Sequence, residues 1–186
     1  LTANDINFSA FEHMDAGFTM PLSDDLETAG YDPLVLSEYL DDPATKSILI
    51  KARSGEREEP VLSAFASTRK LRANDLLEEF GSSEVASTIR KSALGSIASI
   101  GAFYANDVAN VGVSNLKQIL LTEIMTELLD EDYTYVIYRP VNPAGMDEDT
   151  IDLLIYHGFV NISSSEDEPI YAVDTKAPIV LFRDVE

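Results

Sequence analysis

Residues 96–139 read SIASIGAFYANDVANVGVSNLKQILLTEIMTELLDEDYTYVIYR, and this stretch decides the fold. Its pattern predicts a strand, a glycine-bearing loop, a helix and a second strand. The first strand, residues 97–104, is small and apolar on both faces, which is typical of a strand buried inside a sheet. The second, residues 133–138, is rich in β-branched and aromatic side chains. Such a unit favours two parallel strands joined by a right-handed crossover.

The helix between these two strands gives the clearest periodic signal of the chain. Its apolar residues recur at helical spacing and form one stripe: Leu116, Ile119, Leu120, Ile124 and Leu128. We expect Ser114 or Asn115 to cap the helix, because a short polar side chain can accept a hydrogen bond from a first-turn N–H group. The amides of residues 111–115 then point out of a helix N-terminus, which is a site suited to an anion.

The rest of the chain supplies further strands and helices. Residues 47–53 and 61–70 predict an antiparallel pair whose charged loop is too long for a tight turn. The other predicted strands are residues 6–11, 160–163, 170–173 and 179–182, and the other predicted helices are residues 23–28, 33–40, 74–80, 82–93 and 151–156. Asp32 is expected to cap the second helix, and Asp147 or Asp149 the last, which ends at Gly158. The order predicts an α/β (α+β) fold with a mixed sheet: antiparallel N-terminal strands, a central parallel strand–helix–strand unit and a C-terminal strand pair.

The size and composition are those of one globular domain. The chain has 186 residues, of which 45% are hydrophobic, enough for one sizeable core. It opens on Leu1, so we expect a processed product or a piece excised from a longer multidomain chain. No apolar run has the length of a membrane span, no signal peptide opens the chain and no cysteine is present. These features fit a cytoplasmic protein.

The charge is strongly acidic and unevenly distributed. Thirteen basic residues against 33 acidic ones give a net charge of −20, which argues against binding to nucleic acid or to an anionic membrane. Residues 46–91 hold nine of the basic residues and seven acidic ones, a net of +2, which leaves −22 for the remainder. Two interpretations stay open: a solvated, highly soluble surface, or a basic middle segment that approaches an anionic ligand.

Several short motifs fall on the predicted elements in a familiar order. They are the strand 97–104, the loop Ala109-Asn110-Val111-Gly112-Val113-Ser114, the helix 116–129, the strand 133–138 with Asn142, and His157-Gly158-Phe159 after the last helix. This arrangement resembles the GNAT (GCN5-related N-acetyltransferase) superfamily, over residues 47–182 in element order and 97–160 in motifs. Residues 73–94 would then be a helical insertion before the central strand that reshapes the acceptor side.

The resemblance implies transfer of an acetyl group from acetyl-CoA to an amine of a small molecule or a protein. In the family a loop of pattern (Gln/Arg)-x-x-Gly-x-(Gly/Ala) wraps the cofactor's pyrophosphate, and here Gly112 matches it while Ala109 and Ser114 depart from it. The implied cofactor contacts are made by Val111, Gly112, Val113, Ser114, Asn115 and Asn142. The pantetheine arm would pass between strands that separate between Tyr104 and Tyr133.

The candidates for proton transfer lie near the ends of the two central strands. Asp107 or Tyr104 would act as the base, and Tyr138 as the acid. The tyrosine that family members often use as the acid is replaced here by Leu154. Asp107 would need burial to serve near neutral pH, because an unperturbed carboxylate has a pKa of about 4. Packing is the alternative role for both tyrosines, and loop capping the alternative for Asp107.

A second interpretation keeps the fold without the chemistry: a non-catalytic ligand-sensing or interaction module of a larger bacterial protein. The departures in the loop favour this module, while Gly112 and the strand–helix geometry favour the enzyme. The expected partners are a CoA thioester and an amine acceptor, with a homodimer or the neighbouring domains of a longer chain as alternatives. No metal site is predicted, because His13 and His157 lie in separate elements without a spaced set of carboxylates.

Overall fold

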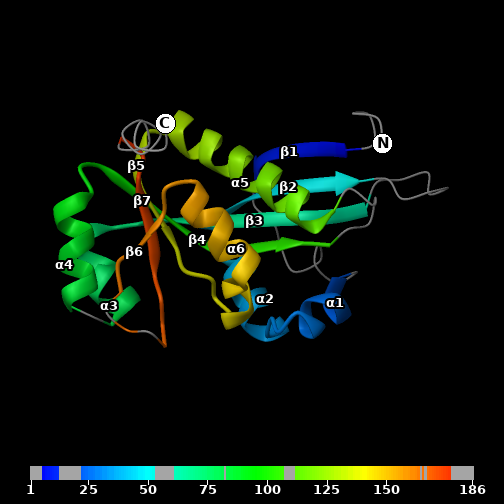
Figure 1. The fold of residues 1–186 in the computed structure, drawn as a ribbon, viewed down its shortest axis with the longest axis horizontal. Coiled ribbons are helices and arrows are strands. Elements are labelled where there is room, and N and C mark those ends of the chain that lie inside the picture. Colours follow the sequence, from blue (N-terminus) through cyan, green and yellow to red (C-terminus); the bar gives the residue numbers. More distant parts are fainter. Residues whose placement is uncertain are drawn as a thin grey trace.

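The computed structural model describes residues 6–12, 22–52, 61–81, 83–106, 112–163, 165 and 167–176. Its strands are β1 (Ile6–Glu12), β2 (Thr45–Ala52), β3 (Val61–Leu71), β4 (Ser96–Ala105), β5 (Tyr133–Tyr138), β6 (Val160–Asn161) and β7 (Tyr171–Asp174). Its α-helices are α1 (Ser23–Thr28), α2 (Pro33–Asp41), α3 (Leu76–Phe80), α4 (Ser83–Ser92), α5 (Val113–Asp130) and α6 (Glu148–Tyr156), and 3-10 turns lie at Ala73–Asp75 and Pro143–Met146. Figure 1 shows α3 and α4 together at one end of the molecule and α1 and α2 below the sheet.

The strands form one mixed sheet in the order β1-β2-β3-β4-β5-β7-β6. Among the described strands, β4 and β5 are parallel and every other neighbouring pair is antiparallel. This confirms the predicted mixed sheet, with its antiparallel N-terminal strands, its central parallel unit and its C-terminal strand pair. The predicted strand at residues 179–182 lies outside the described residues.

Helix α5 joins the two parallel strands and begins earlier than its apolar stripe predicts. It starts at Val113, and Gly112 occupies the N-cap position with a φ of 100°. The N-cap residue is thus Gly112, so the prediction that Ser114 or Asn115 occupies the cap position is wrong. A φ of 100° is open to glycine and strained for other residues, and the backbone turn at Gly112 therefore depends on the missing Cβ.

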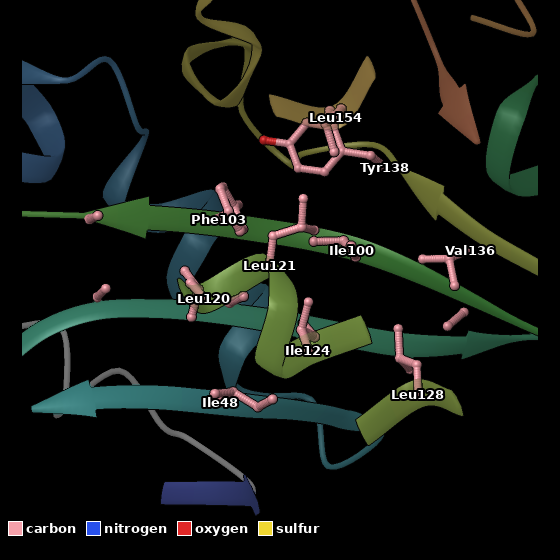
Figure 2. Packing of buried hydrophobic residues seen from close by; sticks show 14 of the residues in the cluster. Ile48, Ile100, Phe103, Leu120, Leu121, Ile124, Leu128, Val136, Tyr138 and Leu154 are labelled. Atoms are coloured by element: carbon pink, nitrogen blue, oxygen red, sulfur yellow. The ribbon is translucent and has the colours of Figure 1, made fainter. Parts of the chain in front are cut away.

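One face of the sheet packs against α5 and α6. Figure 2 shows the α5 side chains of Leu120, Leu121 and Ile124 directed at the strands. All three are fully buried, in one cluster with residues of β2, β4 and β5 such as Ile48 and Val136. Burial of one such side chain contributes about 2 kcal/mol, so this stripe is a main source of the stability of the unit.

The opposite face carries two separate helical layers. The layer from α1 and α2 covers β2, β3 and β4 with a cluster that includes Leu26, Leu36 and Leu40. The layer from α3 and α4 covers β4, β5 and β7 with a cluster that includes Leu76 and Ile89. Residues 73–92 therefore supply packing that the sheet needs on this face.

The helix ends follow the predicted signals at most positions. The Asp32 side chain accepts a hydrogen bond from Leu34 N at 2.9 Å, which confirms the cap of α2. Of the two candidates for α6, Asp147 is the cap and not Asp149. Gly81 separates α3 from α4 with a φ of 60°. Within the described residues, no helix is long and apolar enough to cross a bilayer.

Candidate functional site

β4 and β5 pair along the N-terminal half of β4 and separate along its C-terminal half. Their parallel register ends with Ile100 opposite Tyr138, and Val141 N then donates to the carbonyl of Gly101 at 2.8 Å. β4 continues to Ala105 with β3 as its neighbour. The last residues of β4 therefore have no β5 partner, and the strands separate at their C-terminal ends.

This separation lies at the other end of β5 from the one expected at Tyr133. Tyr133 opens β5 and is opposite Ser96, in the paired part of the two strands. Because the strands are parallel, the C-terminal end of β4, near Tyr104, and the C-terminal end of β5, at Tyr138, lie at the same end of the sheet. The prediction of a gap between Tyr104 and Tyr133 is therefore wrong, because the β5 residue at the gap is Tyr138.

A β-bulge in β4 marks the point of separation. Ala102 is opposite Ser67 of β3 and Ile100 is opposite Thr68, so Gly101 is an extra residue without a partner in β3. A bulge bends its strand and re-aims the side chains that follow it. Here it changes the direction of β4 where the pairing with β5 ends.

The N-terminus of α5 is the part of the candidate site whose geometry best suits an anion. Leu116 N donates to the carbonyl of Gly112 at 3.1 Å, which is the first bond of the helix. The amides of Val113 and Ser114 precede that bond and have no acceptor within the helix, so they form its partly positive end. A Cβ at Gly112 would lie 3.3 Å from Asn115 Nδ2, so the glycine also leaves room for a close approach. Val111, expected to share this role, lies outside the described residues.

A lysine that the sequence did not reveal stands beside this helix end. Lys117 Nζ is 3.1 Å from Asp147 Oδ2 and 2.9 Å from Thr150 Oγ1, and its side chain is only 13% exposed. Burial alone would raise the pKa of Asp147, but hydrogen bonds from Thr150 and the charge of Lys117 outweigh it, and its pKa is lowered. This network ties α5 to the start of α6. The residues lie too far apart in the sequence for any local pattern to link them.

Asn142 lies on the segment that leaves β5. The residue is 5% exposed, and its Oδ1 is buried without a hydrogen-bond partner among the described residues. An orphaned buried acceptor costs roughly 1–3 kcal/mol, so a donor from a ligand would relieve it. The cofactor role expected of Asn142 stays a prediction.

Tyr104 packs on the face opposite α5. Its ring centroid is 6.0 Å from that of Tyr31 and 5.9 Å from that of Phe65. Burial, and to a smaller extent the carboxylate of Asp25, raises the pKa of Tyr104 to about 12. A phenol with this pKa keeps its proton at neutral pH, which does not suit the expected role of base. Asp107, the other candidate, lies outside the described residues.

Tyr138 and Leu154 both belong to the core on the α5 side. Tyr138 is fully buried, its hydroxyl donates to the carbonyl of Gly145, and its ring lies 6.1 Å from Phe103 in an edge-to-face arrangement. Burial raises the pKa of Tyr138 well above its ordinary value. Leu154 is fully buried in the same cluster, as Figure 2 shows. This arrangement assigns Tyr138 to packing, because its proton is already engaged and its pKa is too high for a ready acid.

The segment from α1 to Tyr31 is fastened to the end of β4. The Tyr31 hydroxyl donates to the carbonyl of Phe103 at 2.8 Å, and the Asn106 side chain donates to Asp25 at 2.8 Å. Phe103 in β4 and Asn106 directly after it both lie beyond the bulge, where β5 no longer pairs. The α1 side of the candidate site is therefore closed by protein contacts.

Asn115, another residue expected at the cofactor, lines a hollow of about 450 Å³ along the outer side of α5. The other lining residues are Gln118, Ile119, Thr122 and Glu123. Glu123 is the charged member, so this hollow does not favour a phosphate. Within the described residues no group of three or more His, Asp or Glu side chains could hold a metal ion.

No protein-family model and no curated protein matches the chain. Solved structures match its fold. FeeM, an N-acyl amino acid synthase from uncultured soil microbes, has a TM-score of 0.62 with 16% identity, covering 97% of this chain and 99% of its own. Arabidopsis thaliana NAA60, solved with a bisubstrate analogue, has a TM-score of 0.57 with 13% identity, covering 91% and 98%. A GNAT-family protein of Desulfovibrio desulfuricans has a TM-score of 0.58 with 11% identity, covering 91% and 98%.

The chain has the GNAT fold. The parallel strands β4 and β5, with α5 between them in sequence, are the central unit on which the sequence resemblance rests. At identities of 11% to 16%, the likeness shows the fold alone.

Proposed function

We propose that this protein is an N-acyltransferase that moves an acetyl group from acetyl-CoA to an amine. The observation that carries the proposal is the separation of β4 and β5 beyond Gly101, at the end of these strands that lies near the N-terminus of α5. Two neighbours with the GNAT fold support a CoA donor: NAA60 was solved with a bisubstrate analogue, and the NatC complex with a Gag peptide and CoA.

The cofactor would be held mainly by backbone groups. We propose that the amides of Val111, Gly112, Val113, Ser114 and Asn115 bind the pyrophosphate and that Asn142 binds an amide of the pantetheine arm. Lys117 is the fifth residue of α5, but Asp147 already compensates its charge. When bound, acetyl-CoA supplies the activated acyl carbon. The chain's own residues hold it, orient it and handle the proton of the amine.

Asp107 remains our candidate for the group that takes that proton. It follows Asn106, whose side chain is held by Asp25 on the α1 side of the site. An amine with an ordinary pKa arrives protonated at neutral pH, so a nearby carboxylate can accept its proton directly or through water. Tyr104 would hold the acceptor in place by packing, since its raised pKa does not suit the role of base.

The α3–α4 layer would shape the acceptor side. Arg139, directly after β5, donates to the main-chain carbonyl of Glu79, and its guanidinium lies 5.1 Å from the Phe80 ring centroid. We propose that residues 73–94 are an insertion within one domain that places Glu79 and Arg139 near the amine. Acceptors of two kinds occur among the neighbours: amino acids for FeeM and ribosomal-protein alanine for a Brucella melitensis enzyme.

The second candidate is a GNAT-like module that binds a ligand without catalysis. Two observations favour it: Leu154 has no ionisable group, and Tyr138 is fully buried with its hydroxyl already donating to the carbonyl of Gly145. Such a module would keep the backbone anion site at α5. It would serve as a sensor or as an interaction domain of a longer chain.

Titration with acetyl-CoA separates the two candidates. A ligand at 100 times its dissociation constant adds about 2.7 kcal/mol of stability, which is readily seen as a rise in the melting temperature. A rise together with release of free CoA thiol on a panel of amino acids, polyamines and peptide N-termini supports the enzyme. A rise without thiol release supports the module. No rise at millimolar acetyl-CoA contradicts the donor site and with it the enzyme.

A pair of glycine variants tests where the cofactor binds. Gly112→Ala strains a residue with a φ of 100° at the proposed site, and Gly81→Ala strains one with a φ of 60° between α3 and α4. Both should lower stability, because a positive φ disfavours a side chain. Only Gly112→Ala should also weaken the response to acetyl-CoA. Equal responses in both variants would place the donor elsewhere.

A further inference from the structure

A second hollow lies at the opposite end of the sheet from the proposed thioester site. Its volume is about 350 Å³, and its lining includes Lys46, Thr68, Lys70, Ser96, Glu131 and Tyr133. These residues come from the start of β2, the end of β3, the start of β4 and the start of β5. β4 runs for ten residues from this hollow toward the α5 N-terminus, a length on the order of 30 Å.

Two lysines face the hollow from neighbouring strands. Lys46 is directly opposite Thr68, and Lys70 is two residues further along β3, opposite Ala98. Residues directly opposite, and residues two apart on one strand, share a face of the sheet. Ala98 belongs to the cluster on the α5 side, so both ammonium groups lie on that side, beside the end of α5.

The charges leave one of the two lysines uncompensated. Lys46 Nζ is 3.4 Å from Glu131 Oε1, and this pair is partly exposed. Lys70 has no salt bridge within the described part of the chain. Two ammonium groups on diagonal positions of one face repel each other, and an anion between them would relieve that repulsion. This is notable in a chain of net charge −20, where most of the surface repels anions.

The uncharged lining adds hydrogen-bond donors. Thr68 and Ser96 offer hydroxyl groups, and Tyr133, the first residue of β5, offers a phenol. Burial, followed by the nearby carboxylate of Glu131, raises the pKa of Tyr133, so the phenol stays protonated at neutral pH and able to donate. Ammonium and hydroxyl donors that converge in a hollow of this size match a small oxyanion and not a macromolecule.

We propose that this hollow binds a small organic oxyanion of the carboxylate or phosphate class, at a site separate from the thioester site. It gives a structural place to the basic middle segment, residues 46–91, which supplies both lysines. The proposal does not depend on catalysis, because the hollow lies at the opposite end of the central strands from the proposed thioester site. An occupied site would join β2, β3 and β5 to the end of α5.

Binding of inorganic phosphate and of succinate to the whole chain tests the proposal, each compared with sodium chloride at equal ionic strength so that general screening is matched. Melting temperature and amide NMR shifts are followed for the wild type, Lys70→Gln and Lys91→Gln. Lys91→Gln is the matched control, because it removes the same charge at an exposed residue of α4 outside the hollow. Saturation by phosphate alone assigns the phosphate class, and saturation by succinate alone assigns the carboxylates.

The expected result is saturable binding to the wild type and to Lys91→Gln, with affinity about tenfold weaker in Lys70→Gln. The amide shifts should centre on Ser96 and Tyr133. Tyr133→Phe provides a second variant, which should weaken binding without a change of charge. The same dissociation constant in all variants, no saturation by either anion up to about 10 mM, or shifts centred on Val113 would each overturn the proposal.

Discussion

The ring of Tyr39 in α2 lies directly on the backbone of Gly101, the bulged residue of β4. A Cβ at position 101 would fall 2.7 Å from Tyr39 Cε2 and closer still to Cζ and Oη. The guanidinium of Arg69 lies 4.8 Å from the centroid of the same ring, and Thr45 Oγ1 donates to the Tyr39 carbonyl at 2.9 Å. The tyrosine is thus held from several sides, and the glycine is what allows α2 to approach the point where β4 and β5 separate.

We therefore predict that Gly101→Ala lowers the free energy of unfolding by about 1–3 kcal/mol, the usual cost of overpacking. In a Tyr39→Ala background the clash is gone, and the same change should be neutral or stabilising, because glycine within a strand is less favourable than alanine by roughly 0.5–1 kcal/mol. Urea unfolding of the four proteins gives the coupling energy. Equal effects of Gly101→Ala in both backgrounds would contradict the contact.

The central unit was predictable because its signals are local. The strand 97–104, the helix stripe from Leu116 to Leu128 and the strand 133–138 all appear in the structure with small changes of boundary. A single stretch contains the two strands and the amphipathic helix whose crossover places them parallel and side by side. The same stretch carries the resemblance to the GNAT superfamily.

The site was less predictable because its contacts are distant in the sequence. Nothing in the local pattern around Gly101 indicates that Tyr39 covers it, or that Lys117 reaches Asp147. The apolar stripe of α5 gives no signal for the added turn that begins at Val113, because that turn lies outside the buried face. Tyr138 lies two residues after Val136 and shares its buried face of β5, so strand alternation places its side chain in the core.

The Lys117–Asp147 pair should show itself in the pH dependence of stability. Asp147→Asn keeps an oxygen that can cap α6 and removes the charge. Because the folded-state pKa of Asp147 is lowered from 3.8, its contribution is fully present above that value and is lost as the pH falls through the lowered pKa. The wild type should exceed Asp147→Asn in stability at pH 7, and the difference should shrink below about pH 4.

Asp147→Ala removes the cap as well as the charge and should cost about 1 kcal/mol beyond Asp147→Asn. The measurement is urea unfolding of the three proteins between pH 7 and the acid limit of reversible folding. A wild-type advantage over Asp147→Asn that stays constant on acidification would show that the charge of Asp147 has no stabilising partner.

Arg139 should hold the α3–α4 layer against the end of β5. Its guanidinium donates to the main-chain carbonyl of Glu79, lies 3.5 Å from the Glu79 carboxylate and stacks over Phe80. We predict that Arg139→Met, which keeps the packing length of the side chain, lowers stability by about 1 kcal/mol. Amide hydrogen exchange should accelerate in residues 76–92 more than in α5. Arg72→Met, at an exposed position just before this layer, is the control, and an equal effect of both variants would contradict the role of Arg139.

His157 should titrate below its ordinary range although it sits at the C-terminal end of α6. A helix C-terminus favours a cation, yet burial lowers the pKa of His157 from 6.5, and its Nε2 is buried without a partner among the described residues. The folded state therefore favours the neutral imidazole. The contribution of His157 to stability is present above pH 6.5 and is lost as the pH falls through the lowered pKa. The wild type should lose stability relative to His157→Gln between about pH 7 and pH 5. An NMR titration of the His157 ring should give a midpoint below 6.5, and a midpoint above it would show that the charge of the helix end prevails over burial.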